Sequence, residues 1–577
     1  MDRPGAVGLK RAMDKPLADV SAEMAVDKDA PIPVRDGAIL RANVFRPARP
    51  GRYPVIMSMG IYGKDVHFAD AYKPQWEALR RLCPAVIADE SSGRYLRWEL
   101  PDPERWVPYG YVVIAIDSRG SGKSPGYLDP FSPQETRDYY DAIEWAGVQE
   151  WSNGKVGLLG ISYYSITQWQ VAGLQPPHLA AICPWEGGSD LYRDWSHHGG
   201  IFSSLFPTAW YPRQVLPNQN GNAKSHFRDR ETGERTTGLA LNDALLPGNR
   251  AEHARDLLHH PLDDAWYKER SPHLARITAP LLSAGNWGGA GLHLRGNIEG
   301  FMRAGSSEKW LGMHVGTHFE SFYLPEFVAQ QRRFFDHYLK GLDNGWTSEP
   351  KVLLAIRRPE GATVRAESEW PIGRTQWTKF FLDSQDRMLD LQAPSASATA
   401  TYRSLGEGID FSTAAFAAEV EFTGPLAARL WISSSTTDMD IFASLRMFDP
   451  DGKEVTFTGA SDLVPVARGW LRASHRKLDP DMSLPWRPYH THDDVQKLTP
   501  NQPYPVDVEI WPTSIVFPKG YRMVLTLQGR DFEASNIPGR ILHNHEADRP
   551  ASEFDALNTI HTGAGHESYL LLPRIPQ

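Results

Sequence analysis

A short apolar strand that ends at a Gly-Ile-Ser turn constrains the fold of this chain more than any other feature. The strand and turn read Lys155-Val-Gly-Leu-Leu-Gly-Ile-Ser162, and helix-forming residues follow at once. A buried strand that runs directly into a helix needs a tight corner, and the small Gly160 leaves room for it. The pattern is typical of a nucleophile elbow with Ser162 at its apex. Because Tyr164 replaces the second glycine of the usual Gly-x-Ser-x-Gly motif, an ordinary strand-to-helix turn remains an alternative at this point.

Further short apolar segments predict a sheet around this turn. Two alternating stretches flank an Asp36-Gly37 turn, which is typical of a β-hairpin. Helical periodicity, as over residues 135–149, separates the apolar strands that follow, which are expected at residues 53–59, 111–117, 156–159, 179–184 and 280–285. Apolar strands that alternate with helices favour a mostly parallel sheet covered on both faces. The fold class predicted for roughly the first 345 residues is therefore α/β.

Two long insertions interrupt the predicted sheet, at residues 64–108 and 187–271. Both carry aromatic and helix-forming residues, and open α/β sheets bind ligands at the carboxyl ends of their strands. We therefore expect the insertions to form a lid over that edge. Trp195, Trp210 and the pair His197-His198 are candidates to line an acyl pocket there, although core packing explains them equally well.

The pattern changes from residue 375 onward, where short alternating stretches are separated by turn residues. One example is residues 440–448, which an Asp-Pro-Asp-Gly turn follows. Such a succession predicts an all-β sandwich of jelly-roll type. His490-Thr-His492 and His543-Asn-His545 lie in this part of the chain, and we interpret them as paired surface histidines rather than metal ligands.

Composition limits the classes of function. At 577 residues the chain is too long for one hydrophobic core, so several domains are expected. Apolar residues make up 41% and charged residues 23%, and no window is apolar enough to span a membrane. The net charge of −9, without a basic run, argues against a nucleic-acid partner. Cys83 and Cys183 have no disulfide-framework or metal spacing, and the first residues form no apolar leader, so a cytoplasmic location is expected.

A serine at an elbow needs a base to take its proton and donors to hold the oxyanion. His318 lies in a glycine-containing loop after the last predicted strand, which is the position of the base in the chain order Ser, acid, His. His314 is expected to lie on the strand itself. Upstream, Tyr62 follows the strand at residues 53–59, at the place that normally supplies part of the oxyanion hole. These residues predict acyl transfer.

Ordered motifs along nearly the whole chain add to this prediction. They include Tyr62-Gly-Lys-Asp65, Asp117-Ser-Arg-Gly-Ser-Gly-Lys-Ser-Pro-Gly126, Gly160-Ile-Ser-Tyr-Tyr164, Phe334-Phe-Asp-His-Tyr-Leu-Lys-Gly341 and Gly469-Trp-Leu-Arg-Ala-Ser-His475. In these motifs the chain resembles the CocE/NonD (cocaine-esterase-like) serine hydrolases, which are related to X-Pro dipeptidyl peptidases and α-amino-acid ester hydrolases. The resemblance implies an α/β-hydrolase domain at residues 1–186 and 272–350, a helical cap at 187–271, and a C-terminal jelly-roll β-sandwich at 351–577.

The resemblance also implies roles for particular residues, and chemistry without a metal or other cofactor. By motif, Ser162 is the nucleophile and His318 is the general base. The Tyr62 hydroxyl and the backbone N–H of Tyr163 form the oxyanion hole. The alternatives are that Tyr62 only packs in its loop and that His318 caps a helix. Ser165 stands where the family has a glycine, a departure that we expect to leave the chemistry unchanged.

The more serious departure concerns the acid of the triad. Relatives carry Trp-Tyr-Asp where this chain reads Asn286-Trp-Gly-Gly289, so the usual carboxylate is missing. Glu186 ends the preceding strand, and adjacent parallel strands lie ~4.8 Å apart, so a longer side chain could reach across. Gly288 and Gly289 would leave it space. We therefore predict Glu186 as the acid, with Asp190 as second choice and Glu320 as third; an exposed Glu186 at a loop start is the structural alternative.

The sequence thus predicts a serine hydrolase that cleaves a carboxylic ester through an acyl-enzyme on Ser162. No dedicated carboxylate cluster that would hold a substrate ammonium is evident, so neutral or aromatic acyl esters are favoured over peptides. An amidase or X-Pro-type aminopeptidase is the alternative among enzymes. A catalytically silent ligand-binding module is the alternative from another class, and the missing aspartate is its main support. The expected partner is a small ester or amide substrate, with no nucleic acid or membrane; a homodimer stays open.

Overall fold

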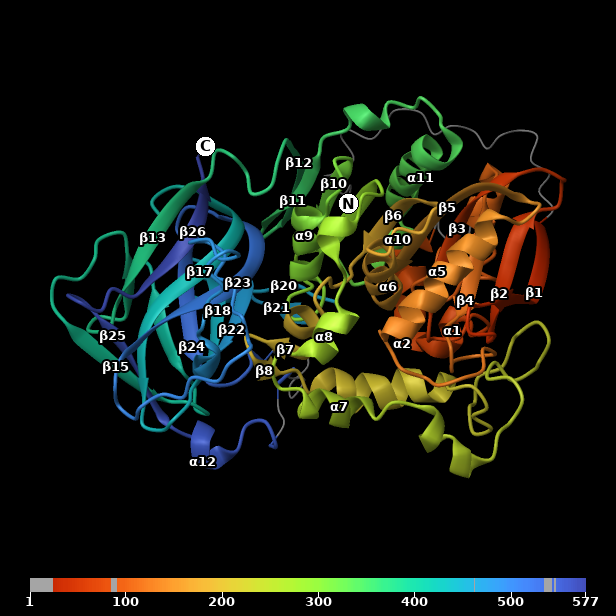
Figure 1. Ribbon diagram of the computed structural model, residues 1–577. Coiled ribbons are helices and arrows are strands. Elements are labelled where there is room, and N and C mark those ends of the chain that lie inside the picture. The colour runs from red at the N-terminus through yellow and green to blue at the C-terminus, as the bar shows by residue number, and fades with distance from the viewer. Residues whose placement is uncertain (1–23, 85–90, 461, 534–541, 544–545, 577) are drawn as a thin grey trace.

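The computed structural model describes residues 24–84, 91–460, 462–533, 542–543 and 546–576. Figure 1 shows two lobes side by side. The lobe drawn in red to green carries a sheet flanked by helices, and the lobe drawn in cyan to blue consists mainly of strands. An α/β lobe is therefore followed by an all-β lobe, in the order that the change of sequence pattern predicts.

The sheet of the α/β lobe is parallel at its centre and antiparallel at its edges. Its strands are β1 (Met24–Pro33), β2 (Ile39–Pro47), β3 (Tyr53–Gly60), β4 (Val112–Asp117), β5 (Ser152–Ile161), β6 (Leu179–Trp185), β9 (Leu281–Asn286), β10 (Lys309–His314), β11 (Val352–Arg358) and β12 (Gly361–Glu367). Hydrogen-bonded neighbours follow the order β1, β2, β4, β3, β5, β6, β9, β10, β11, β12. The pairings from β4 to β11 are all parallel, so their carboxyl ends meet at one edge.

Helices cover both faces of this sheet because successive strand residues point to opposite sides. Val55 and Met57 of β3 pack in one core with α5 (Pro133–Gly147), α6 (Tyr163–Ala172) and α9 (Leu294–Arg303). Ile56, between them, packs in the other core with α11 (Pro325–Lys340). Every residue of α6 is buried, including Gln168 and Gln170, whose side-chain amides donate to backbone carbonyls. Ser162 therefore lies between a buried strand and a buried helix.

The two insertions cover the carboxyl edge of the strands. The first contains α1 (Phe68–Ala71), α2 (Lys73–Leu82), α4 (Pro103–Trp106) and η1 (Val107–Tyr109). The second contains η2 (Leu191–Ser196), β7 (His197–His198), β8 (Ile201–Phe202), η3 (Phe206–Val215), η4 (Leu216–Asn218), η5 (Asp243–Leu245), η6 (Pro247–Asn249), α7 (His253–His259) and α8 (Ala265–Arg270). Short helices thus predominate, with a β-hairpin and a long irregular stretch between η4 and η5. The cap boundaries at residues 187 and 271 stay predictions.

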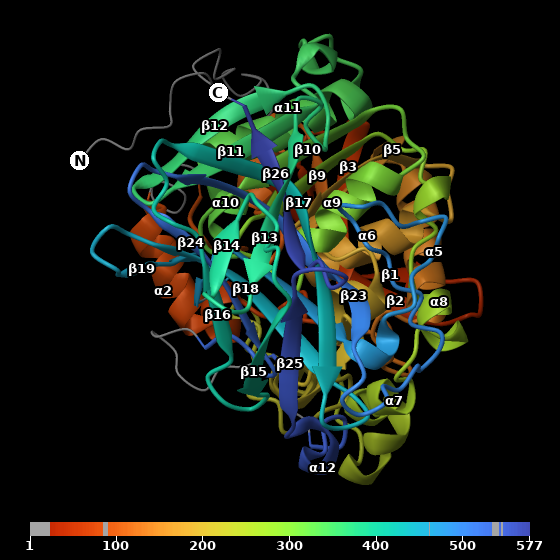
Figure 2. The same ribbon diagram turned by 90° about the vertical axis from the view of Figure 1, so that its left-hand side faces the viewer.

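The second lobe is built from mostly antiparallel strands, and Figure 2 views it face on. The strands are β13 (Gln376–Asp383), β14 (Met388–Asp390), β15 (Ala398–Arg403), β16 (Ile409–Ser412), β17 (Val420–Ser434), β18 (Asp440–Phe448), β19 (Glu454–Val455), β20 (Phe457–Thr458), β21 (Leu463–Val464), β22 (Ala467–Arg472), β23 (Tyr504–Phe517), β24 (Arg522–Gln528), β25 (Leu557–Thr562) and β26 (Tyr569–Ile575). They enclose an apolar core of their own. An all-β lobe is therefore present, whereas its jelly-roll strand order stays a prediction.

The two lobes are joined through continuous strand pairing. β11 pairs in parallel with β10, so the predicted domain boundary at residue 350 falls between two hydrogen-bonded strands. β11 also contacts β23 of the all-β lobe through the pair Arg357 and Ile515. The lobes therefore share a hydrogen-bonded connection rather than only a flexible linker.

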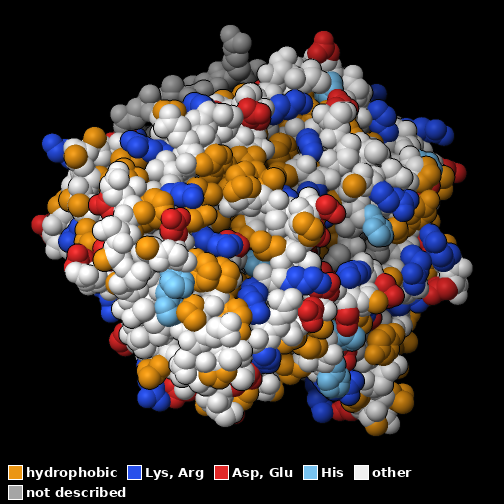
Figure 3. All heavy atoms as spheres, turned by 60° about the vertical axis from the view of Figure 1, so that its left-hand side comes forward, with side chains coloured by type: hydrophobic (Ala, Val, Ile, Leu, Met, Phe, Trp, Pro, Cys, Tyr) orange, Lys and Arg blue, Asp and Glu red, His pale blue; other side chains and the backbone are white. Residues whose placement is uncertain are grey.

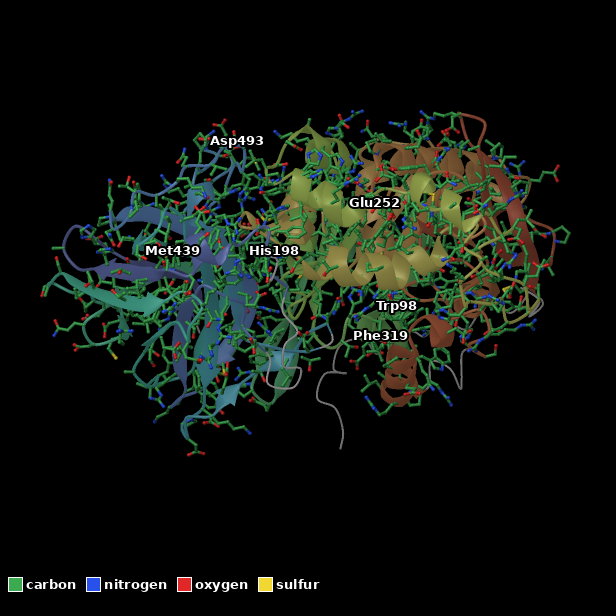
Figure 4. All side chains as sticks on the ribbon, turned by 90° about the horizontal axis from the view of Figure 1, so that it is seen from below. Trp98, His198, Glu252, Phe319, Met439 and Asp493 are labelled. Carbon is green, nitrogen blue, oxygen red and sulfur yellow. The ribbon has the colours of Figure 1, made fainter. Side chains whose placement is uncertain are left out.

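Buried histidines occupy the junction between the lobes. The Nδ1 of His198 lies 2.7 Å from Nε2 of His543, and Nδ1 of His475 lies 3.2 Å from Nδ1 of His492. Figure 4 places His198 where the two lobes meet. The interpretation of His490-Thr-His492 and His543 as surface residues was wrong: all three are at most 3% exposed, because the second insertion packs on them. His545 lies outside the described residues.

Other general expectations can be compared with the structure. Cys83 and Cys183 are both buried, as small apolar residues would be. Figure 3 shows positive and negative side chains mixed over one face, in keeping with a net charge spread along the chain. In the described part of the chain, no helix has the length and apolar character needed to cross a bilayer.

Candidate active site

Ser162 lies at a sharp corner between β5 and α6. Its backbone has φ 57° and ψ −115°, a region that non-glycine residues rarely adopt. A Cβ on Gly160 would lie 2.5 Å from the Cβ of Tyr164, so this corner cannot form with a larger residue there. The Ser162 N–H donates to the carbonyl oxygens of Trp185 and Glu186, 3.1 Å from each. The predicted elbow geometry is therefore present, and the second glycine of the usual motif is not needed for it.

The departure at Ser165 is accommodated by a neighbouring glycine. A Cβ on Gly187 would lie 2.1 Å from the Oγ of Ser165, so the absence of a side chain at Gly187 makes room for the extra hydroxymethyl group. Ser165 is fully buried on the first turn of α6 and is absent from the lining of the pocket described below. The helix thus keeps its close approach to the strand.

Glu186 follows β6 and His318 follows β10, and these two strands flank β9 in the sheet. Trp185 pairs with Ala284, and the N–H of Glu186 donates to the Ala284 carbonyl at 2.7 Å, so Glu186 stands at the end of the strand next to β9. Its Oε2 lies 2.9 Å from Nδ1 of His318. Glu186 is fully buried and has φ 45°. The exposed alternative for Glu186 is therefore wrong.

The other two candidate acids lie elsewhere. Asp190 caps η2 and accepts hydrogen bonds from the backbone and the guanidinium of Arg193. Glu320 is the first residue of α10 (Glu320–Tyr323). Within the described residues, the carboxylates in hydrogen-bond contact with the His318 ring are those of Glu186 and one further residue described below.

The space that we expect Gly288 and Gly289 to leave for Glu186 is bordered by other residues. A Cβ on Gly288 would lie 2.4 Å from the carbonyl oxygen of Thr458, so a loop of the all-β lobe fills that space. The same loop reaches the site, because the His318 N–H donates to the Ala460 carbonyl at 3.2 Å. Asn286, on the strand that carries the acid in the family, donates to the Gly316 carbonyl at 2.9 Å and to Oε1 of Glu186 at 3.4 Å. Gly288 therefore supports the contact between the lobes, whereas a Cβ on Gly289 would meet Asn286 and Leu294 of the same lobe.

Tyr62 lines the same pocket as Ser162. Its oxygen accepts a hydrogen bond of 2.9 Å from the Trp210 indole N–H, which leaves the phenolic proton free to point elsewhere. Burial, together with the negative charge of Glu99, raises the pKa of Tyr62 well above its ordinary value, so the hydroxyl stays protonated. Tyr163 is the first residue of α6, and the first N–H groups of a helix have no partner within the helix. The two predicted oxyanion donors thus lie beside Ser162.

A second glutamate, Glu99, contacts the other nitrogen of His318. Its Oε1 lies 2.9 Å from Nε2, and the side chain is 2% exposed. The φ of Glu99 is 64°, so backbone strain recurs at Ser162, Glu186 and Glu99. Sequence reasoning missed this residue because it lies in the first insertion, outside any recognised motif. Only the irregular segment around it, rich in Trp and Pro, distinguished the region.

His318 lies between two glutamates, and both raise its pKa. Burial by itself lowers its pKa, but the charge and hydrogen bond of Glu186, with those of Glu99, outweigh this and raise the pKa to about 10. Burial raises the pKa of the Glu99 carboxyl, against the opposing effect of His318. Nε2 of His318 and Oε1 of Glu99 therefore share one proton, while Nδ1 of His318 donates to Glu186.

A pocket of about 310 Å³ opens beside these residues. Ser162, His318, Tyr62 and Glu99 line it, and most of the remaining wall is aromatic or apolar, including Tyr72, Trp98, Phe131, Trp195, Phe206, Trp210 and Phe319. Figure 4 shows Trp98 and Phe319 close together in the α/β lobe. Of the predicted pocket residues, Trp195 and Trp210 line it. His197 and His198 do not, because they pack at the junction between the lobes.

Both parts of the chain match known protein families. Residues 36–320 match the X-Pro dipeptidyl-peptidase (S15 family), and residues 344–571 match the X-Pro dipeptidyl-peptidase C-terminal non-catalytic domain. The chain is 33% identical to a CocE/NonD family hydrolase from Staphylococcus aureus, with a TM-score of 0.83 over 96% of this chain and 94% of that one. The chain belongs to the CocE/NonD hydrolase family.

Other members and neighbours of the CocE/NonD family are more distant. Cocaine esterase of a Rhodococcus species is 25% identical over 96% of this chain and 100% of its own length. An aminopeptidase from a Thaumarchaeota archaeon shares the fold, with a TM-score of 0.68 at 16% identity over 98% of each chain. This CocE/NonD protein is therefore a hydrolase with an α/β-hydrolase domain of the S15 type and a C-terminal non-catalytic domain.

Proposed function

We propose that this protein is a serine esterase that cleaves carboxylic esters through an acyl-enzyme on Ser162. The observation that carries the proposal is that a strained elbow serine lines the same pocket as a histidine that is bonded to a buried glutamate. That arrangement is what nucleophilic acyl transfer requires. We also propose the domain boundaries predicted from the sequence and a jelly-roll strand order for the second lobe.

In the proposed reaction, the Ser162 oxygen attacks the ester carbonyl carbon and its proton passes to His318. Glu186, bonded to Nδ1, orients the ring and stabilises the imidazolium. Tyr62 and the Tyr163 N–H hold the negative charge that develops on the carbonyl oxygen. Loss of the alcohol leaves the acyl-enzyme, and a water molecule activated in the same way releases the acid.

An ester with an apolar or aromatic acyl group suits the pocket best. Aromatic and apolar side chains make most of the wall, so they favour apolar substituents through burial of their surface. Cleavage of an amide is the second candidate, because both parts of the chain match X-Pro dipeptidyl-peptidase families. Kinetics on matched esters, amides and aminoacyl anilides would separate the two, since kcat/KM decides preference.

Labelling with a fluorophosphonate tests the proposal directly, because only an activated serine is phosphonylated. We expect the probe mass on the peptide that contains Ser162, together with loss of ester hydrolysis. The Ser162→Ala variant should remain unlabelled. Absence of labelling in an otherwise folded protein, or labelling of a different serine, would refute the esterase proposal and favour a ligand-binding module.

Removal of the Tyr62 hydroxyl should slow the chemical step. The Tyr62→Phe variant is expected to lose ~10²- to 10³-fold in kcat with little change in KM, because the donor acts on charge that develops in the transition state. Tyr211→Phe is a matched control, since that buried hydroxyl donates to the Ala251 carbonyl and is not part of the pocket wall. A loss below about fivefold in Tyr62→Phe would mean that another group fills the oxyanion hole.

A further inference from the structure

The carboxylate of Glu99 occupies the side of His318 that an attacking serine normally uses. Oε1 of Glu99 bonds to Nε2, whereas Glu186 bonds to Nδ1 on the opposite side of the ring. Across the residues that the structure describes, no hydrogen bond runs directly from Ser162 to the His318 ring. A proton that leaves Ser162 therefore meets Glu99 before it reaches His318.

The second oxygen of Glu99 is available on the serine side. Oε2 is buried and, among the described residues, has no hydrogen-bond partner within 3.5 Å. The Ser162 hydroxyl nevertheless lies near enough to this carboxylate to favour its ionised form. A buried carboxylate oxygen without a partner is costly, so its presence in an active-site pocket calls for a functional explanation.

The backbone holds Glu99 in this place. Its carbonyl oxygen accepts the N–H of Ile161 at 3.1 Å, immediately before the elbow serine. The preceding residue, Trp98, stacks on Tyr72 with ring centroids 4.1 Å apart and also packs against His318. These contacts maintain the positive φ of Glu99 and hold the residue in one position in the pocket wall.

We propose that Glu99 is a catalytic residue that relays the proton between Ser162 and His318. The proposal deepens the proposed function and rests on it, because it requires Ser162 to be the nucleophile. One oxygen of the carboxylate serves the serine and the other serves the histidine. The working site is thus a line of four groups, Ser162, Glu99, His318 and Glu186.

The relay balances in both directions. Before attack, the proton shared by Glu99 and His318 lies on Oε1. As the bond from Ser162 Oγ to the carbonyl carbon forms, the serine O–H breaks, Oε2 takes that proton, and Oε1 passes its proton to Nε2. The imidazolium is stabilised by Glu186. When the bond to the leaving oxygen breaks, the transfers run backwards and protonate that oxygen; water then replaces the serine hydroxyl in deacylation.

Glu99→Gln tests the relay because it keeps the shape of the side chain but cannot pass a proton between two oxygens. We expect kcat for an ester to fall by ~10²- to 10³-fold in a folded protein, the usual contribution of a positioned acid-base group. Glu104→Gln is a matched control from the same segment. Its carboxylate accepts hydrogen bonds from Ser91 and Ser92 and does not line the pocket, so that variant should stay within about threefold of wild type.

Chemical rescue distinguishes proton relay from a structural role. The Glu99→Ala variant leaves a space that formate can enter, so added sodium formate should raise its kcat by about tenfold or more, with sodium chloride of equal ionic strength as control. A side chain that only maintains the fold would give no rescue specific to a carboxylate.

Two outcomes would overturn the relay alone. One is a Glu99→Gln variant that hydrolyses the ester as fast as, or faster than, an active wild type. The other is a folded Glu99→Ala variant that formate does not rescue. The first would mean that Glu99 merely covers Nε2. A wild-type protein that neither hydrolyses esters nor reacts with the fluorophosphonate would overturn the proposed function as well. The wild-type measurements therefore separate the two failures.

Discussion

Replacement of Ser162 by alanine should lower kcat for ester hydrolysis by ~10⁶-fold, the scale on which serine hydrolases depend on their nucleophile. The variant loses the covalent step entirely, because no hydroxyl remains at the elbow to form the acyl-enzyme. KM should change little, since the aromatic wall of the pocket remains intact. Steady-state kinetics on an activated ester would measure the loss, and a thermal melt would show that the fold is retained.

Ser165→Ala is the matched control for this experiment. Ser165 lies three residues further along α6, is fully buried, and its Oγ has no hydrogen-bond partner among the described residues. We expect its kcat to remain within about threefold of wild type. Retention of more than ~1% of kcat in Ser162→Ala would show that another group is the nucleophile.

Glu186→Gln should lower kcat by up to ~10⁴-fold in a protein that still folds. The amide keeps the size of the carboxylate but carries no charge to stabilise the imidazolium. It can also donate to Nδ1, which favours the wrong tautomer of His318. The negative charge of Glu186 is the largest influence that raises the pKa of His318, so the variant should also show a lower pKa for that ring, measurable by NMR titration.

Asp190→Asn and Glu320→Gln are the controls for Glu186, because both were candidate acids and neither touches the His318 ring. They should cost far less activity than Glu186→Gln. If either proves more damaging, the triad must be assigned to that residue. If Glu99→Gln is severe while Glu186→Gln is mild, Glu99 is the main partner of His318 and Glu186 only positions the ring.

The agreement between sequence and structure at Glu186 has a simple origin. Its selection needed only that strands 179–184 and 280–285 be adjacent and parallel, which β6 and β9 are. The prediction that Gly288 leaves space for Glu186 was wrong. A side chain at position 288 would instead clash with the carbonyl oxygen of Thr458 in the other lobe. Strand adjacency follows from the regular geometry of a sheet, whereas contact with a loop more than 150 residues away does not.

The sequence by itself determined the α/β class, the elbow at Ser162 and the loop position of His318, because periodicity and turn chemistry are properties of short segments. It also determined the family through motifs spread along the chain. Only the tertiary structure decided that Glu99 reaches Nε2 of His318, and that the histidines of the second lobe are buried. Both depend on how irregular insertions fold back across the sheet. Such contacts join segments far apart in the chain, and their packing leaves no local periodic pattern to read.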